Sequence, residues 1–354
     1  MKTTLITLCF AVLAASAAVD VENPVCEGFT LEGYLDARYQ EYGAYNQVPS
    51  REFSIRRAGL EAKAEITGNF EAELKLEFRP DEMFLKDAFL QWDPLSGIQG
   101  RFGLFRGETI LGGELSTWEL PFYERPLVYD LREDLTYSTR DLGLDVELEL
   151  PPMGFLQLAG TAGIFNGDER GDVRSDNELL YSFRGTAEII PADLTLGLSA
   201  VSHRIGMADQ SVPSGYRSSE RLMAFSGDLS YHHSFSNWYD GTIYAEASTG
   251  DNWRLCDVLA GEDPPRFLGY WGGLTFNYHP WTVQTIRTIS LSLGYDHLEQ
   301  DTEMDWKEKR VSLIASVYPT ENTRVRFGGV RTTMETLLNS DEYTDIILEA
   351  GLRF

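Results

Sequence analysis

The chain has 354 residues, of which 43% are hydrophobic and 12% aromatic, and its formal net charge is -25 at pH 7. It is too apolar to be a disordered chain, and its composition excludes collagen-like and low-complexity architectures. An acidic chain of this kind repels phosphate backbones, so no nucleic-acid partner is expected.

The N-terminus has the three regions of a secretory signal peptide. Lys2 is followed by an apolar run at residues 5–14 and by small residues at 15–18. Signal peptides combine these regions in this order, and the stretch is too short to span a bilayer comfortably. We therefore predict a signal peptide at residues 1–18 and a mature domain at residues 19–354. The alternative is an uncleaved N-terminal anchor.

Beyond residue 18 no stretch approaches the length of apolar sequence that a transmembrane helix needs. The exported chain is then either soluble or a closed β-barrel, which is the other structure that can span a membrane. Removal of the predicted signal peptide takes away Cys9 and leaves Cys26 and Cys256. Two cysteines are too few for a disulfide framework.

A strict two-residue period favours the barrel. Between residues 70 and 79 every even position is apolar and every odd position is charged, and similar alternation returns at residues 58–66 and 142–150. Successive side chains of a strand point to opposite faces, so these segments have one apolar and one charged face. Charges at alternate positions of several long strands are typical of transmembrane barrels with a wet lumen.

Extending this pattern along the chain predicts an all-β fold, a transmembrane barrel of sixteen antiparallel strands. An even number of strands of about ten residues suits a bacterial outer-membrane barrel. We expect strands at residues 29–39, 53–67, 70–79, 84–93, 97–107, 140–150, 155–166, 181–190, 194–204, 221–232, 239–249, 267–279, 288–297, 308–318, 323–333 and 345–354.

The connections between these strands alternate between short and long. Residues 94–97 and 151–154 are short and contain turn residues, whereas residues 108–139 and 205–220 are long. Outer-membrane barrels have tight periplasmic turns and long extracellular loops, which would place both termini on the periplasmic side. The connection at residues 80–83 is the exception, because it is short where a long one is expected.

Several segments of the N-terminal half resemble a known family. The segment FSIRRAGLEAK at residues 53–63 resembles the early strand motif of the phosphate-selective porin O and P family, and LKDAFL at 85–90 resembles the strand that follows it. Segments at 103–105, 122–125, 140–144 and 163–167 follow in the family's order. The resemblance covers about residues 29–167 and is only architectural beyond. It implies a sixteen-stranded trimeric outer-membrane porin whose third extracellular loop folds inward and narrows the pore.

The C-terminal segment also carries a resemblance. Residues 345–354 alternate in polarity and end in Phe354. This ending resembles the last strand of outer-membrane proteins, whose terminal aromatic residue is read by the barrel-assembly machinery. Phe354 is therefore the candidate assembly signal. The alternative is that an apolar last residue only completes the lipid-facing surface.

The sequence departs from the family in its lysines. Phosphate-specific members use clustered lysines and arginines, whereas this chain has only six lysines, one of them in the predicted signal peptide. Phosphate selectivity is therefore not carried over by default.

The alternation also predicts which charges face the lumen. If the first strand rises from the periplasm, inward arginines lie near the extracellular end, and inward glutamates such as Glu71 and Glu147 lie near the periplasmic end. Fixed charge in a narrow passage filters ions. The alternative is that opposite charges only pair across neighbouring strands. The candidate pore-lining residues are Arg38, Arg57, Lys63, Lys75, Arg79, Arg184 and Arg310.

The longest connection, residues 108–139, is rich in aromatic and charged residues. Aromatic side chains need a surface to pack on, and folding into the barrel supplies one. We expect this loop to narrow the pore, the alternative being a trimer-contact or surface loop. Its candidate constriction residues are Trp118, Glu119, Glu124, Arg125 and Arg132.

No enzyme, metal or cofactor is expected. His232 and His233 are adjacent and would point to opposite faces of a strand, and no metal-binding or phosphate-loop pattern occurs. A barrel hydrolase is the alternative that this argument disfavours.

The sequence thus predicts a bacterial outer-membrane porin through which small hydrophilic, ionic solutes diffuse passively, with anions such as phosphate among the candidates. Expected partners are outer-membrane lipid and lipopolysaccharide, the barrel-assembly machinery, the solutes, and further copies of the chain in a homotrimer. The alternative is a non-conducting outer-membrane barrel that serves adhesion or envelope structure.

Overall fold

The computed structural model describes residues 27–43, 50–80, 82–107, 109–116, 118, 120, 122–138, 140–167, 179–204, 221–258, 264–280, 285–302, 306–336 and 340–354, without the side chains of residues 256–258. The predicted signal peptide at residues 1–18 and the candidate Glu119 lie outside these residues.

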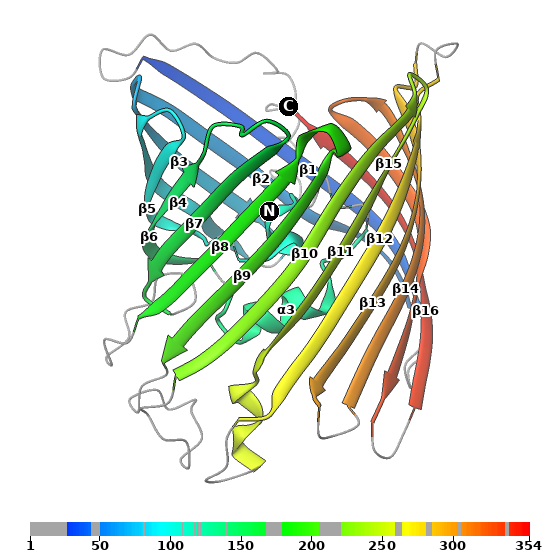
Figure 1. The fold of residues 1–354 in the computed structure, drawn as a ribbon. Helices are drawn as coiled ribbons and strands as arrows, with labels where there is room; N and C mark the ends of the chain where they lie inside the picture. The colour runs from blue at the N-terminus through cyan, green and yellow to red at the C-terminus, as the bar shows by residue number, and fades with distance from the viewer. Residues whose placement is uncertain are drawn as a thin grey trace.

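The described residues form a closed barrel of sixteen strands, each paired with its neighbours in sequence. Figure 1 shows the strands tilted across the barrel wall. The strands are β1 (Gly28–Tyr42), β2 (Ser50–Thr67), β3 (Phe70–Phe78), β4 (Met83–Leu95), β5 (Ile98–Arg106), β6 (Arg140–Glu149), β7 (Leu156–Phe165), β8 (Leu180–Ile189), β9 (Leu194–Arg204), β10 (Arg221–Ser236), β11 (Tyr239–Asp251), β12 (Arg266–Tyr278), β13 (Thr288–Asp301), β14 (Trp306–Thr320), β15 (Thr323–Glu335) and β16 (Ser340–Arg353).

The barrel closes where β16 pairs with β1 in antiparallel register, with Arg38 opposite Glu349. At the end of this seam the backbone N–H of Gly33 donates to the carbonyl of Phe354 at 2.8 Å, and the N–H of Phe354 donates to the carbonyl of Gly33 at 3.0 Å. Closure leaves no unpaired strand edge, which a barrel in hydrocarbon requires.

The two faces of the wall have opposite polarity, as the sequence period predicts. On β6 the apolar residues Leu144 and Val146 are 45% and 46% exposed, whereas Asp145 between them is 2% exposed. On β13 Leu291 and Leu293 are exposed while Ser292 is buried. This inversion of the soluble pattern, with apolar residues outside and polar residues inside, is the surface of a barrel that faces lipid.

Short helices lie in the connections. They are α2 (Leu111–Glu114), α3 (Leu127–Asp134), η2 (Ile190–Ala192) and η3 (Trp253–Val258). None of the described helices is long and apolar enough to cross a membrane. Both α2 and α3 belong to the connection between β5 and β6, which is the predicted third extracellular loop and is called the third loop below. This loop folds into the barrel, and Figure 1 shows α3 inside the wall.

The predicted fold class, an all-β antiparallel barrel of sixteen strands with an inward-folded third loop, is confirmed. The main difference is strand length. Several strands extend further than predicted; for example, β10 continues to Ser236 and β14 begins at Trp306. Pairing continues at these ends although the apolar and polar alternation has stopped, so sequence period alone misses them.

Candidate functional site

The third loop is held inside the lumen by contacts with two parts of the barrel wall. On one side, Arg324 and Arg326 of β15 donate to the carbonyl oxygens of Trp118 at 2.7 Å and Phe122 at 2.9 Å. The hydroxyl of Tyr123 donates to the carbonyl of Ile347 on β16 at 2.9 Å. These contacts fix residues 118–123 against the seam of the barrel.

On the other side, α3 is fixed to β11 and β13. The N–H of Leu127 donates to the carboxylate of Asp296 at 2.6 Å, and Arg132 donates to the hydroxyl of Ser248 at 2.9 Å. The ring of Phe122 lies over Gly273 and Gly294, where any side chain would meet it. These anchors hold α3 against the wall formed by β11 to β13.

An apolar core fills the lumen under the loop on this side. Leu127, Val128, Leu131 and Leu135 of the loop pack with inward side chains of the neighbouring strands, among them Phe267. Inward positions of these strands are therefore apolar where they meet the loop, and the loop closes this part of the cross-section.

Two cavities lie beside the loop, along the wall formed by β1 to β6. The lower cavity, of about 610 Å³, lies on the side of the C-terminal Phe354, and the upper cavity, of about 470 Å³, lies on the side of the β3–β4 connection. The residues that line both cavities define the neck between them. Five of the described residues do so, and all are basic: Arg57, Lys86, Arg106, Arg125 and Arg140.

Carboxylates stand beside most of the neck cations. Arg57 pairs with Asp36 at 2.6 Å, Arg140 pairs with Asp87 at 2.7 Å, and Lys86 pairs with Glu77. Such pairs hold the cations in place at the lumen surface and partly neutralise them.

The loop supplies the opposite side of the neck. Arg106 lies 3.3 Å from Glu133, and its guanidinium is 4.9 Å from the ring centre of Tyr129. Arg125 lies 4.6 Å from the same ring and donates to the carbonyl of Gly112. Among the described residues Arg125 has no carboxylate partner, so it contributes uncompensated positive charge.

Arg125 and Tyr129 have shifted pKa values. Burial, together with the neighbouring cations Arg106 and Arg140, lowers the pKa of Arg125 to about 10, although Tyr129 and Glu133 oppose this shift. Arg125 therefore remains charged at neutral pH. Burial raises the pKa of the Tyr129 phenol, which stays neutral.

Two β-bulges add cations to this wall. The register of β1 with β2 shifts between Asp36 and Ala37, so that Arg56 and Arg57 follow each other on the lumen side. The register of β3 with β4 shifts between Lys75 and Leu76, and Lys86 then reaches Glu77 in the lumen. A bulge places two successive residues opposite one partner, which breaks the strict alternation of faces.

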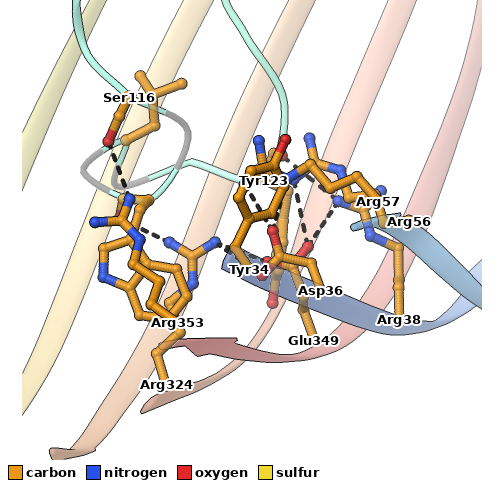
Figure 2. Close-up of polar contacts among 12 residues, drawn as sticks. Tyr34, Asp36, Arg38, Arg56, Arg57, Ser116, Tyr123, Arg324, Glu349 and Arg353 are labelled. Atoms are coloured by element: carbon orange, nitrogen blue, oxygen red, sulfur yellow. Dashed lines mark hydrogen bonds and ion pairs between the residues drawn. The ribbon is translucent and has the colours of Figure 1, made fainter. Parts of the chain in front are cut away.

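A buried charge cluster lies next to the neck at the barrel seam (Figure 2). Glu349 is fully buried and is contacted by Arg38 at 3.0 Å and by Arg56 at 3.5 Å. Arg324 at 3.2 Å and Arg326 at 3.1 Å contact the same carboxylate from β15. We call Glu349 and these four arginines the seam cluster. It joins four strands, β1, β2, β15 and β16, and its β15 arginines also hold the third loop.

A third cavity, of about 330 Å³, lies on the other side of residues 122–126. Its lining includes Asp130 of α3 and Arg310 of β14. The confined position in the lumen, together with the carboxylates Glu124, Glu133 and Asp296, raises the pKa of Asp130 to about 7, although Arg310 opposes this shift.

Four of the candidate pore-lining residues line cavities in the structure, and Lys63 does not. Arg57 belongs to the neck, Lys75 lines the lower cavity, Arg79 the upper and Arg310 the third. Lys63 lines none of these cavities. It lies 3.0 Å from Glu61 on its own strand and 3.6 Å from Glu73 on β3, and the second contact is the pairing across neighbouring strands that the sequence left open as the alternative.

Two candidates are buried instead of facing open lumen. Arg38 is 8% exposed and lies behind Glu124, and Arg184 is 3% exposed and pairs with Asp228 at 2.6 Å and with Glu114 of α2. Arg184 thus anchors the third loop. Parity correctly points it inward, but the loop covers it.

The candidate constriction residues of the third loop fall into two groups. Glu124 and Arg125 line cavities, as expected for constriction residues. Trp118 does not project freely, because it lies between Arg324 at 4.2 Å and Arg353 at 4.5 Å. Arg132 does not reach the pore axis. It is fully buried against Ser248, so the expectation that it lines the passage is wrong.

The expected division into a basic upper and an acidic lower lumen does not describe the cavities. The lower cavity is lined by eight basic and six acidic side chains, and the upper cavity by seven basic and five acidic side chains.

Sequence reasoning missed several residues of the neck and the seam cluster. They are Arg56, Lys86, Arg106, Arg140, Arg324, Arg326 and Glu349. Only Arg324 and Arg326 carry a clear signal, since they alternate with Val325 and Phe327.

Within the described residues no group of three or more His, Cys, Asp or Glu side chains could hold a metal ion. The charges of the lumen are engaged with one another and with the third loop. A closed barrel with an apolar outer surface, a wet lumen and an inward loop defines the porin class of folds.

Comparisons with known proteins give the same class. No family model and no curated protein sequence matches the chain. Its structure matches the outer membrane channel DcaP of Acinetobacter baumannii with a TM-score of 0.62 and 11% identity, over 95% of this chain and 99% of that chain. It matches an anion-selective porin from Comamonas acidovorans with a TM-score of 0.60 and 10% identity, over 92% and 98%.

A further match is OmpT of Vibrio cholerae in its trimer form, with a TM-score of 0.56 and 12% identity, over 92% of this chain and 99% of that chain. At these identities the likeness concerns the fold alone. The chain has the sixteen-stranded porin fold, and its resemblance to the phosphate-selective porin O and P family stays a prediction.

Proposed function

We propose that the chain is a bacterial outer-membrane porin that lets small hydrophilic solutes diffuse passively and prefers anions. The observation that carries the preference is the neck, where all five residues shared by the two cavities are basic. Fixed charges at a narrow point select ions of the opposite sign, and confinement makes each charge act more strongly than in bulk water.

The overall charge of -25 does not oppose this proposal. Screening limits the reach of exposed charges to about 8–10 Å at physiological ionic strength, so residues at the neck dominate what a permeating ion meets there. Arginine binds oxyanions through paired N–H groups, which makes phosphate and carboxylates the natural candidates among anions.

The proposal extends to processing and assembly. We infer removal of residues 1–18 on export, insertion by the barrel-assembly machinery, contact with lipid and lipopolysaccharide, and assembly as a homotrimer. The trimer form of the Vibrio cholerae protein supports the last point by analogy of fold.

The test is a planar bilayer recording of the purified, folded protein. Discrete conductance steps, with a reversal potential in a potassium chloride gradient that indicates chloride preference, are the expected result. Absence of steps would favour the non-conducting barrel of adhesion or envelope structure. A cation-selective reversal potential would contradict the role given to the neck.

A further inference from the structure

Glu124 occupies an unusual position at the edge of the seam cluster. It belongs to the third loop, its side chain is 49% exposed, and it lines both the upper and the third cavity. Its carboxylate accepts hydrogen bonds from Arg38 at 2.5 Å and from Arg56 at 2.8 Å. One carboxylate from a loop is thus held by two arginines of the wall.

The two arginines differ in their access to the lumen. Arg56 lines the upper cavity, whereas Arg38 is 8% exposed and lines none of the three cavities. Glu124 therefore stands between Arg38 and the lumen water. If its side chain moved aside, both guanidiniums would face the upper cavity.

The charge balance of the cluster leaves room for an anion. Besides Glu124, the four arginines share the buried carboxylate of Glu349, and Asp36, 3.7 Å from Arg324, pairs with Arg57 at 2.6 Å. Four guanidiniums thus depend mainly on two carboxylates. Glu349 is fully buried in a strand and cannot leave, whereas Glu124 is a half-exposed loop side chain.

Glu124 is ionised at neutral pH. Its position inside the lumen alone would raise its pKa, but Arg56 and Arg38 outweigh this effect and hold the pKa of Glu124 below its ordinary value. The preceding residue, Tyr123, is held by contacts that do not involve the Glu124 carboxylate, since its hydroxyl donates to the carbonyl of Ile347 and its own carbonyl accepts from Arg38. The side chain can thus change rotamer without movement of the loop.

We propose that Arg38 and Arg56 form a carboxylate-binding subsite of the channel, and that Glu124 is an internal ligand that competes with solute carboxylates for it. This inference rests on the proposed anion channel and deepens it. Paired guanidinium groups recognise a carboxylate by charge and by the direction of their N–H groups, and a solute bearing the same group meets the same geometry. The solutes concerned are small carboxylate anions.

With an internal competitor, the apparent affinity for a solute is the intrinsic affinity multiplied by the fraction of time for which the site is free. If Glu124 occupies the subsite for most of the time, its removal increases the apparent affinity by about three- to tenfold. The effect should be specific for carboxylates, because a neutral analogue gains nothing from two exposed guanidiniums.

The experiment uses propionate, which reproduces the end of the Glu124 side chain, as the probe. Full-length protein is recorded in planar bilayers in chloride, and the propionate concentration that halves the chloride current is measured. Glu124→Gln is expected to lower this concentration by about three- to tenfold. Propionamide, the neutral analogue, should not block either protein.

The matched control is Glu82→Gln. Glu82 is 48% exposed and lies 3.7 Å from Arg79, so the variant removes the same charge at a similarly exposed position on the same wall. It should leave the half-blocking concentration unchanged. The double variant Glu124→Gln with Arg56→Gln should lose the gain. Glu124→Asp, which keeps the charge on a shorter side chain, should give an intermediate gain and serves if Glu124→Gln folds poorly.

Three results would overturn the inference: equal shifts in Glu124→Gln and Glu82→Gln, no shift in either Glu124 variant, or retention of the gain in the double variant. Failure of the proposed function is recognised separately. It would appear in the wild-type protein before propionate is added, as a reversal potential without anion preference.

Discussion

Arg125 offers the most direct test of the neck at the level of one residue. Its guanidinium packs on Tyr129 and has no carboxylate partner among the described residues, so its replacement leaves no buried carboxylate behind. Arg125→Gln should therefore fold normally and lower the anion-to-cation permeability ratio by about three- to tenfold, since a charge a few ångströms away contributes about 1 kcal/mol or more.

The ratio is obtained from the reversal potential at low salt, and the difference should shrink at 1 M salt, where the screening length is about 3 Å. Arg331→Gln is the control, because Arg331 is 61% exposed, pairs with Glu342 and lines none of the three cavities. An unchanged ratio in Arg125→Gln would remove Arg125 from the filter.

Asp130 predicts a dependence of selectivity on pH. Because the pKa of Asp130 is raised to about 7, its carboxyl group is largely neutral at pH 5.5 and negative at pH 8.5. Ionisation adds a negative charge to the upper and third cavities, so the anion preference should fall as the pH rises through about 7. Reversal potentials measured between pH 5.5 and pH 8.5 test this dependence of the anion preference on pH. Asp130→Asn should keep the low-pH value throughout, and the idea fails if the variant titrates as the wild type does.

The bulges show where reasoning from sequence reaches its limit at the level of the strand. Alternation predicts Arg57 inward and Arg56 outward, and the first half of this is right. Arg56 also faces the lumen because the register shifts opposite Asp36, and Lys86 does so for the same reason. A bulge depends on the pairing of two strands, so no single strand records it.

Glu349 links the strands of the seam to the third loop. Its carboxylate is shared by Arg38, Arg56, Arg324 and Arg326. Glu349→Gln would leave four guanidiniums in a buried site with too little negative charge. Removing one partner from a buried ion pair typically costs about 3–5 kcal/mol, so a clear loss of heat-resistant folded barrel is expected.

Aliquots of the sample are heated to a series of temperatures and then separated by gel electrophoresis. The measurement is the temperature at which the band of the folded form disappears. The control is Glu321→Gln, which breaks an exposed pair with Arg287 and should change little, since such pairs contribute about 0–1 kcal/mol. Equal stability of both variants would show that the seam cluster does not stabilise the barrel.

At the scale of the whole molecule, closure depends on the last residue. Phe354 exchanges two backbone hydrogen bonds with Gly33, and its ring lies over that glycine, where any side chain would meet it. Deletion of Phe354 removes both hydrogen bonds and the ring, whereas Phe354→Ala removes only the ring. We expect less folded protein in the outer membrane for both, and the greater loss for the deletion.

Phe354→Trp keeps an aromatic ring and should fold nearly as well as the wild type. If the deletion gives the wild-type amount of heat-modifiable protein, Phe354 is neither an assembly signal nor needed at the seam.

The architecture could be predicted because its signal is local. Each strand places apolar residues toward lipid and polar residues toward water, and this alternation can be counted along the chain without knowledge of any partner strand. The neck could not be predicted in the same way. Arg125 comes from the third loop and meets Arg57, Arg106 and Arg140 of the wall only after the loop has been placed. The burial of Arg132 and Arg184 depends on the same placement.

The wall that binds residues 118–124 of the third loop is formed by the first and last strands of the barrel. This determines when the loop can bind to the wall. Tyr123 binds a carbonyl 224 residues later in the sequence, and Arg38 reaches Glu349 across 311 residues. The first contact needs the last strand in place, and the second also needs the first and last strands to have met. The narrowed passage must therefore be a late product of biogenesis, and an arrested assembly intermediate would carry the loop without a place to bind it.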